Sequence, residues 1–143
     1  MNITKNFSYE EFYQSATARK MGFYEQFTPP DDVVENIERL VINLLQPLRD
    51  LLPGVMIISS GYRCPRLNQA VGGVQKKDGT ISQHVKGEAA DIIYTENGLK
   101  KSQKLIETLR DSGLDFDQCI DEKKGTWVHL SYSSNNRKQF LKL

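Results

Sequence analysis

The chain has 143 residues, of which 38% are hydrophobic and 26% are charged, and its formal net charge is +1. This size suits one soluble globular domain with its own core, and the charge excludes a strongly basic nucleic-acid binder. No apolar stretch approaches the ~20 residues that span a bilayer, and Met1 to Phe23 lack the apolar core of a signal peptide. We therefore expect a monomer that is cytoplasmic at synthesis, without membrane insertion or nucleic-acid binding.

The first third of the chain predicts helices. Ser8-Tyr9-Glu10-Glu11 matches a capping box, so a short helix is expected to begin at Ser8. The clearest helix spans residues 33–52, where apolar residues recur at three- and four-residue steps. Pro47 lies inside that pattern and is expected to kink or break the helix near Leu45.

Strands dominate the remainder. Residues 55–59 predict a short buried strand, residues 66–70 a helical turn, and residues 89–94 a second strand. The glycine-rich residues 72–82 predict a loop at the edge of a site. Helices followed by a mostly antiparallel sheet indicate an α+β domain.

One helix is expected between the second strand and a hairpin. Thr95 or Asn97 would cap this helix, Leu99 would lie on its inner face, and Gly113 would end it. Residues 116–122 and 126–132 predict the two arms of the hairpin, and residues 135–143 a last short strand or turn.

The two histidines of the chain are its most informative residues. Together with Asp91, His84 and His129 would give two neutral imidazoles and one carboxylate. Three such ligands leave a fourth tetrahedral position open, as in catalytic zinc sites. Taken singly, each histidine could equally be an ordinary packed side chain. Cys64 and Cys119 have no Cys-x-x-Cys spacing and suit packed thiols, although a disulfide between them is possible.

The histidines lie in motifs that resemble a known family. Ser-x-His-x-x-Gly-x-Ala-x-Asp at residues 82–91 is preceded by Ile-Ser-Ser-Gly-Tyr-Arg at 58–63 and followed by Trp-Val-His at 127–129. This series is similar to that of the zinc D-alanyl-D-alanine carboxypeptidases, a family that includes phage L-alanyl-D-glutamate endolysins and shares a fold with the Hedgehog signalling domain. The resemblance covers about residues 33–132.

The resemblance implies a Hedgehog-like α+β fold, with a small, mostly antiparallel sheet and helices packed on one side. It implies a single domain over residues 1–143, with a helical extension at 1–30 and the catalytic core at 31–134. It also implies that His84, Asp91 and His129 bind Zn²⁺.

Further site residues follow from the same resemblance. Arg63 is placed in the cleft, where it would grip a substrate carboxylate or stabilise an oxyanion. A structural salt bridge is the alternative for Arg63. Ser82 and Gln83 would border the substrate, although Ser82 could equally cap a turn.

The general base does not follow from the resemblance. Many members of the family carry Asp or Glu three residues before the last histidine, but Thr126 occupies that position here and cannot serve. The hairpin offers a candidate, because directly opposed residues of an antiparallel pair share a face. If Glu122 opposes Trp127, Glu122 lies one diagonal step from His129 on the same face.

The turn length decides between two neighbouring acids. An even turn over residues 123–126 favours Glu122, whereas an odd turn would place Asp121 opposite His129. Asp117 is a further alternative, and both hairpin acids could simply be solvated charges.

The expected function is zinc-dependent hydrolysis of peptide bonds in peptidoglycan stem peptides. The chain would be a compact phage or prophage endolysin that acts on the cell wall after release, or a host carboxypeptidase exported by another route. The non-enzymatic alternatives are a Hedgehog-like zinc-binding module and a phage structural component.

Overall fold

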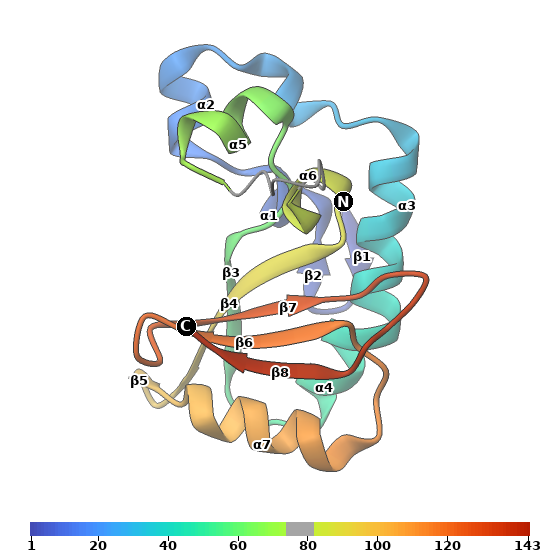
Figure 1. The fold of residues 1–143 in the computed structure, drawn as a ribbon, viewed down its shortest axis with the longest axis vertical. Coiled ribbons are helices and arrows are strands. Elements are labelled where there is room, and N and C mark those ends of the chain that lie inside the picture. The colour runs from blue at the N-terminus through green and yellow to red at the C-terminus, as the bar shows by residue number, and fades with distance from the viewer. Residues whose placement is uncertain (74–81) are drawn as a thin grey trace.

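The protein, represented by a computed structural model, is described over residues 1–73 and 82–143. Its chain begins with a two-stranded sheet of β1 and β2, continues mainly with helices and forms the main sheet later (Figure 1). The helices are α1 (Tyr9–Tyr13), α2 (Ala16–Met21), a 3-10 helix (Tyr24–Phe27), α3 (Asp31–Leu40), a π-helical segment (Val41–Leu45), α4 (Gln46–Asp50), α5 (Pro65–Ala70), α6 (Gln83–Lys86) and α7 (Ser102–Ser112). The strands are β1 (Asn2–Thr4), β2 (Phe7–Ser8), β3 (Val55–Ser60), β4 (Ala89–Glu96), β5 (Leu99–Lys100), β6 (Gln118–Glu122), β7 (Trp127–Ser131) and β8 (Gln139–Lys142). In this described part, no helix combines the length and the apolar character needed to cross a membrane.

The main sheet has the strand order β3-β4-β7-β6-β8, and β5 pairs with the end of β4. All neighbours are antiparallel except β6 and β8, which run parallel. The α+β class and the mostly antiparallel sheet are therefore confirmed. β8 also accounts for the strand expected in the C-terminal tail.

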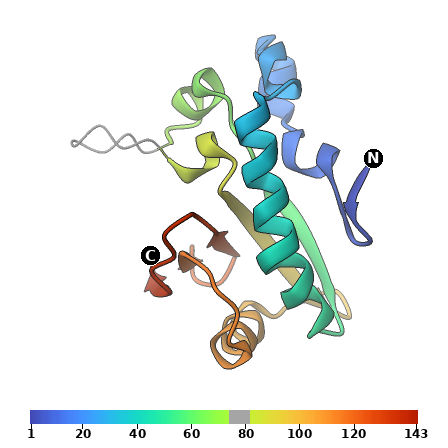
Figure 2. The same cartoon turned by 90° about the vertical axis from the view of Figure 1, so that its right-hand side faces the viewer.

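One face of the sheet is covered by helices, as Figure 2 shows for α3, α4 and α7. Alternate residues of the strands point to this face and bury their side chains against the helices, because successive strand residues face opposite sides. The residues of the strands that are buried in this core are Met56, Ile58, Ala90, Ile92, Tyr94, Cys119, Val128 and Leu130. The other face, called here the open face, carries the alternate set that includes Asp91, His129 and Glu122.

The first thirty residues pack into the same core. Phe7 and Phe12 are almost completely buried and belong to the core cluster that contains α3. Gln26 has no exposed surface, and its side-chain amide donates to the carbonyls of Tyr13 and Tyr62. Its carbonyl accepts from the Cys64 N–H. The N-terminal segment is thus fastened to the chain that follows β3.

The long helix accommodates Pro47 without a break. The chain stays helical from α3 to α4, but residues Val41–Leu45 form a π-helical segment in which the Gln46 N–H donates to the Val41 carbonyl, five residues back. Pro47 has no N–H and its ring crowds the carbonyl of the preceding turn. A wider turn immediately before it relieves both problems, so the distortion expected near Leu45 takes this form.

Three expectations about local structure are wrong. Neither Thr95 nor Asn97 caps α7: Asn97 and Gly98 have positive φ and form the turn between β4 and β5, and α7 begins at Ser102. Leu99 lies in β5 and is 62% exposed. Asn-Gly is a preferred two-residue hairpin turn, which outweighs its capping propensity here. The strand at 55–59 is half exposed rather than buried, because Val55 and Ile57 point to the open face.

Gly87 ends α6 in a crowded left-handed conformation, whereas Gly113 ends α7 in an open one. Both have φ near +75°, but a Cβ on Gly87 would lie 2.6 Å from the Val33 carbonyl oxygen and one on Gly113 would meet nothing within 4 Å. We expect Gly113→Ala to lower the free energy of unfolding by about 1–2 kcal/mol from backbone strain alone. Gly87→Ala should lower it by roughly 1–3 kcal/mol more, because α6 must also move away from α3. Urea unfolding of both variants checks this, and equal losses would contradict it.

Candidate metal centre

Two of the three predicted ligands face each other across neighbouring strands. Asp91 on β4 is paired with His129 on β7, so both side chains project from the open face. The Nδ1 atom of His129 lies 3.2 Å from Oδ1 of Asp91. The small residues Ala89 and Ala90 precede Asp91 at the start of β4, and Ala89 and Ala90 are both buried.

The third ligand comes from a short helix placed above the end of the sheet. His84 lies in α6, whose first turn is capped by the Ser82 hydroxyl, which accepts from the His84 N–H. Gly87 reverses the chain after α6 and leads it into β4. His84 therefore approaches Asp91 from the helix while His129 approaches from the strand, and Nε2 of His84 lies 3.4 Å from Oδ1 of Asp91.

The protonation of His84 suits a metal ligand. Its Nδ1 lies 2.7 Å from the Gly61 carbonyl oxygen, and a carbonyl can only accept, so Nδ1 carries the proton. In the neutral ring, Nε2 then presents a lone pair toward the Asp91 carboxylate. Two acceptors at this distance require a cation or a second proton between them. A backbone carbonyl that orients a ligating imidazole in this way is a common feature of zinc sites.

The spacing of the donor atoms also fits a small tetrahedral ion. Ligands at about 2.0–2.1 Å from zinc lie about 3.3 Å apart along a tetrahedral edge. The two distances that involve Asp91 are 3.2 and 3.4 Å, and all three donor atoms lie within 4.8 Å of one another. All three side chains are at least 85% buried, with exposures of 3%, 14% and 11% for His84, Asp91 and His129. The residues present therefore fit the metal that the resemblance implies.

The electrostatics favour an ionised Asp91. Burial alone would raise the pKa of Asp91, but when the imidazoles carry the second proton, hydrogen bonds from His129 and His84, together with the charge of the rings, hold the pKa well below its usual value. Asp91 is therefore a carboxylate at neutral pH, as a metal ligand must be.

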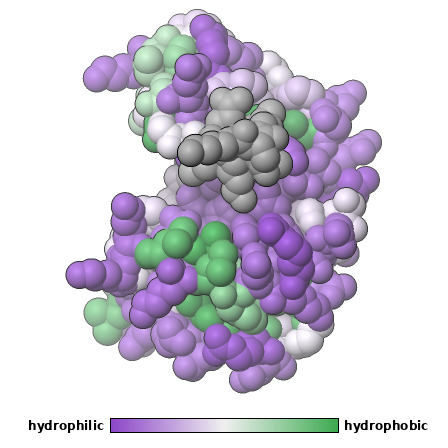
Figure 3. Space-filling view, in the orientation of Figure 1, coloured by the Kyte–Doolittle hydropathy of each residue, from purple (hydrophilic) through white to green (hydrophobic). Residues whose placement is uncertain are grey.

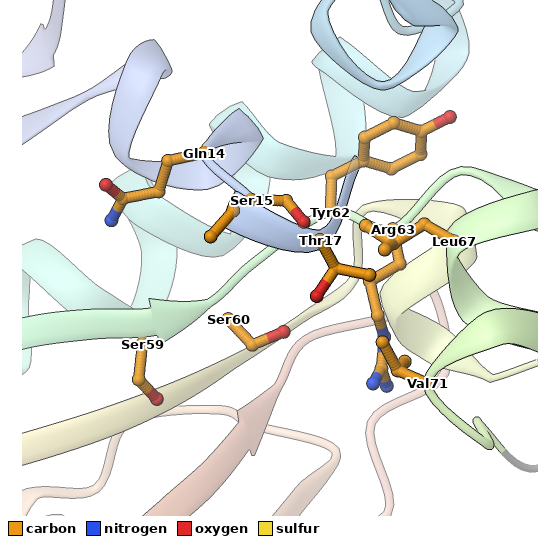
Figure 4. Close-up of a pocket in the computed structure, with 10 residues that line it drawn as sticks. Gln14, Ser15, Thr17, Ser59, Ser60, Tyr62, Arg63, Leu67 and Val71 are labelled. Atoms are coloured by element: carbon orange, nitrogen blue, oxygen red, sulfur yellow. The ribbon is translucent and has the colours of Figure 1, made fainter. Parts of the chain in front are cut away.

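Arg63 lies in a cleft next to these ligands. The cleft has a volume of about 280 Å³ and opens between β3, α5 and the start of α2. Figure 3 shows the molecule hollowed between the part that contains α2 and the sheet. In Figure 4 the hydroxyls of Thr17 and Ser60 are turned toward each other within this cleft. The Arg63 side chain extends past them on the right of the view. The N-terminal segment thus forms one wall of the cleft, which no sequence motif indicated.

The Arg63 side chain is buried in part and has a polar atom without a hydrogen-bond partner among the described residues. Burial lowers the pKa of Arg63, and the nearby charges of Asp91 and Glu122 oppose that shift, so both carboxylates lie within electrostatic reach. Within residues 1–73 and 82–143, the buried Nε of Arg63 has no hydrogen-bond partner and the side chain forms no salt bridge. A guanidinium with a free N–H group can donate hydrogen bonds to an anionic group of a bound molecule.

The structure separates the candidates for a general base. β6 and β7 pair with Glu122 opposite Trp127 and Ile120 opposite His129, which is the register predicted from the even turn. Glu122 therefore shares the open face with His129. Asp121 is opposite Val128 and projects toward the helix-covered face.

Asp117 is engaged elsewhere. Its carboxylate is 97% buried and accepts from Nε and Nη2 of Arg137 and from the Arg137 N–H. It also accepts from the Gln83 side chain at 2.8 Å, and Gln83 directly precedes His84. Asp117 and Arg137 thereby fasten the helix of His84 to the C-terminal part of the chain. Gln83 and Arg137 lie 34 and 20 positions from Asp117 in the sequence. No motif links the three residues, so the sequence alone does not indicate this cluster.

The structure also places Ser82, Gln83 and the two cysteines. Ser82 caps α6, and its neighbour Gln83 bonds to Asp117, so both side chains support the helix that carries His84. The loop predicted at residues 72–82 lies mostly outside the described residues. Cys64 and Cys119 are buried free thiols, and burial raises the pKa of Cys119 to about 12, which makes it a packing residue.

The Asp117 cluster predicts a specific pH dependence. Hydrogen bonds from Arg137 lower the pKa of Asp117 to about 2, against an ordinary value near 3.8. Since the pKa is lower in the folded state, the carboxylate stabilises the fold above about pH 4, and this contribution is lost as the pH falls toward 2. We expect Asp117→Asn to cost roughly 2 kcal/mol at pH 7 and much less at pH 2.5. Denaturant unfolding at both pH values measures the difference, and a cost that is equal at the two values would contradict this origin.

Comparison with known proteins agrees with the geometry. The family model described as Peptidase M15 matches residues 5–131, which is most of the chain and includes all three candidate ligands. The search of the curated proteins returns no match. Peptidases of this family are zinc-dependent, which agrees with the His-Asp-His group, and the family supports metallopeptidase activity. The predicted resemblance and the Hedgehog-like α+β fold are therefore confirmed, and the chain belongs to the peptidase M15 family.

Proposed function

We propose that this protein hydrolyses peptide bonds in the stem peptides of peptidoglycan, with Zn²⁺ held by His84, Asp91 and His129. The observation that carries the proposal is the convergence of two imidazole nitrogens on Oδ1 of Asp91 in a buried site beside an open cleft. Three protein ligands are the usual number at a catalytic zinc. When bound, zinc supplies Lewis acidity that polarises a peptide carbonyl and brings the pKa of water toward neutrality.

Glu122 is the proposed general base. It takes a proton from the attacking water and delivers it to the leaving amine. Its position on the open face, one diagonal step from His129, supports this role. Asp121 remains the alternative from the sequence, but it projects toward the other face. Asp117 accepts three hydrogen bonds from Arg137, which leaves little of its carboxylate free for proton transfer.

Arg63 is the proposed anion-binding group of the cleft. Its Nε, which has no partner among the described residues, and its place in the lining of the cleft support contact with a substrate carboxylate or with the oxyanion that forms during hydrolysis. The Thr17 and Ser60 hydroxyls line the same cleft and can bond polar groups of a peptide. Ser82 and Gln83 remain proposed substrate neighbours at the first turn of α6.

Two enzymatic roles suit this chemistry. The first is a phage or prophage endolysin, which reaches the wall when the host membrane is permeabilised, and the second is an exported carboxypeptidase. A non-catalytic zinc-binding module and a phage structural component are the alternatives. The departure at Thr126, where many members of the family carry an acid, is the observation that favours the non-catalytic module. Mass spectrometry of muropeptides incubated with the zinc-loaded protein identifies the bond that is cut, and absence of products at stoichiometric zinc would support the module.

Zinc binding is testable apart from catalysis. We expect Zn²⁺ at 100 times its dissociation constant to stabilise the protein by about 2.7 kcal/mol, seen as a higher unfolding temperature. Asp91→Asn should abolish most of this shift, because it removes the charge that lies between the two imidazoles. Asp121→Asn makes the same chemical change on the other face of the sheet and should retain the shift. A shift that survives in Asp91→Asn would place the metal elsewhere.

The base is tested by a second pair of variants. Glu122→Gln should reduce hydrolysis of purified peptidoglycan at least about 100-fold while zinc binding is retained, because the amide cannot accept the proton. Asp121→Asn serves as the matched control and should stay near the wild-type rate. The opposite outcome, with Asp121→Asn inactive and Glu122→Gln active, would assign the base to Asp121.

A further inference from the structure

Glu122 lies at the end of a strand, where the backbone and its neighbours restrict its side chain little. It is the last residue of β6, and Lys123, Lys124 and Gly125 follow it in a turn with positive φ. The side chain is partly exposed. A glutamate in this setting has three free torsions, and ordering such a side chain costs up to about 2 kcal/mol. A base at this position therefore needs a partner that restricts it.

Trp127 is that partner. It is paired with Glu122 across the hairpin, and its indole Nε1–H donates to Oε2 of Glu122 at 2.8 Å. Trp127 is the first residue of β7 and lies on the same face as His129, two residues further along the strand. The indole is itself partly buried, so its ring is held by the sheet while its N–H points to the carboxylate.

The hydrogen bond from Trp127 engages only one of the two oxygens of the Glu122 carboxylate. Among the residues that the structure describes, Oε1 of Glu122 accepts no hydrogen bond and the carboxylate forms no salt bridge, even though Lys123 and Lys124 are adjacent. Indole N–H is a donor only and stays uncharged, so it can orient Glu122 without supplying or removing a proton. A lysine in the same place would pair with the carboxylate and compete with proton transfer.

We propose that Trp127 is a positioning residue that holds the Glu122 carboxylate on the open face, with Oε1 left available for proton transfer. The inference rests on the proposed function, because it assigns Trp127 a purpose only if Glu122 is the base. It also accounts for a base on the opposite hairpin strand from His129. Thr126 lies in the turn directly before the strand of His129, whereas Glu122 lies on the opposite strand and needs the cross-strand indole.

The test compares three variants of the zinc-loaded full chain. Trp127→Phe keeps a six-membered aromatic ring but removes the N–H donor together with the five-membered ring that carries it, and we expect kcat to fall roughly 10- to 100-fold with KM changed less than about twofold and zinc stoichiometry intact. Thr126→Val removes a hydroxyl that bonds the Lys123 carbonyl in the same turn, so it controls for general loosening of the hairpin and should retain kcat. Glu122→Gln is measured in parallel.

The pattern of losses separates the two proposals. If Glu122→Gln is inactive and Trp127→Phe turns over normally, the positioning role is overturned and the base assignment stands. If Glu122→Gln is active, the base assignment itself fails. Equal losses in Trp127→Phe and Thr126→Val would show a stability effect of the hairpin and would also overturn the positioning role.

A measurement without substrate tests the hydrogen bond directly. Trp127 is the single tryptophan of the chain, so its indole N–H gives one resolved ¹H–¹⁵N signal. We expect this proton to resonate downfield and to exchange slowly with solvent, and Glu122→Ala to move it upfield and accelerate its exchange at least tenfold. A signal that is unchanged in Glu122→Ala would refute the contact whatever the activity of the enzyme.

Discussion

The pairing of β4 with β7 is the constraint on which the site depends. It places Asp91 directly opposite His129, so two proposed ligands far apart in the sequence meet on one face. The side-chain period of a strand is two, so a slip of one residue would turn His129 into the core and bring Val128 or Leu130 to the metal. Val128 and Leu130 are completely buried on the other face, and moving them to water would be costly. The hydrophobic core thus enforces the register that the proposed metal site needs.

The other parts of the site are attached to this pair by hydrogen bonds from distant segments. The Gly61 carbonyl orients His84, Asp117 and Arg137 hold α6, and Gln26 fastens the N-terminal segment to the chain around Arg63. Each contact satisfies a buried polar group, and such groups are costly to leave unpaired. The ligands and the cleft are therefore held in place before any metal or peptide arrives, which limits the reorganisation that binding requires.

The sequence predicted the parts of this structure that depend on local rules. The capping box at Ser8, the left-handed end of the helix at Gly113 and the register of Glu122 with Trp127 each follow from a few neighbouring residues. The Asn97-Gly98 turn also has a local signal, because Asn-Gly is a preferred hairpin turn, but the capping propensity of asparagine competes with that signal. The π-helical response to Pro47 could not be foreseen, because it depends on keeping the apolar face of α4 against the sheet. The Asp117 cluster and the N-terminal wall of the cleft join segments with no shared pattern, and only the three-dimensional structure brings them together.

Gly61 links the first helix of the chain to the chemistry of an imidazole. A side chain on Gly61 would lie 2.8 Å from the Phe12 backbone, and the next residue, Tyr62, donates its N–H to the Phe12 carbonyl. The carbonyl of the same Gly61 determines which nitrogen of His84 carries the proton. The tautomer of a proposed metal ligand therefore depends on how α1 docks. If the proposed site binds zinc, evolution or engineering can adjust its affinity by altering Phe12 and its neighbours, without changing any of the three proposed ligands.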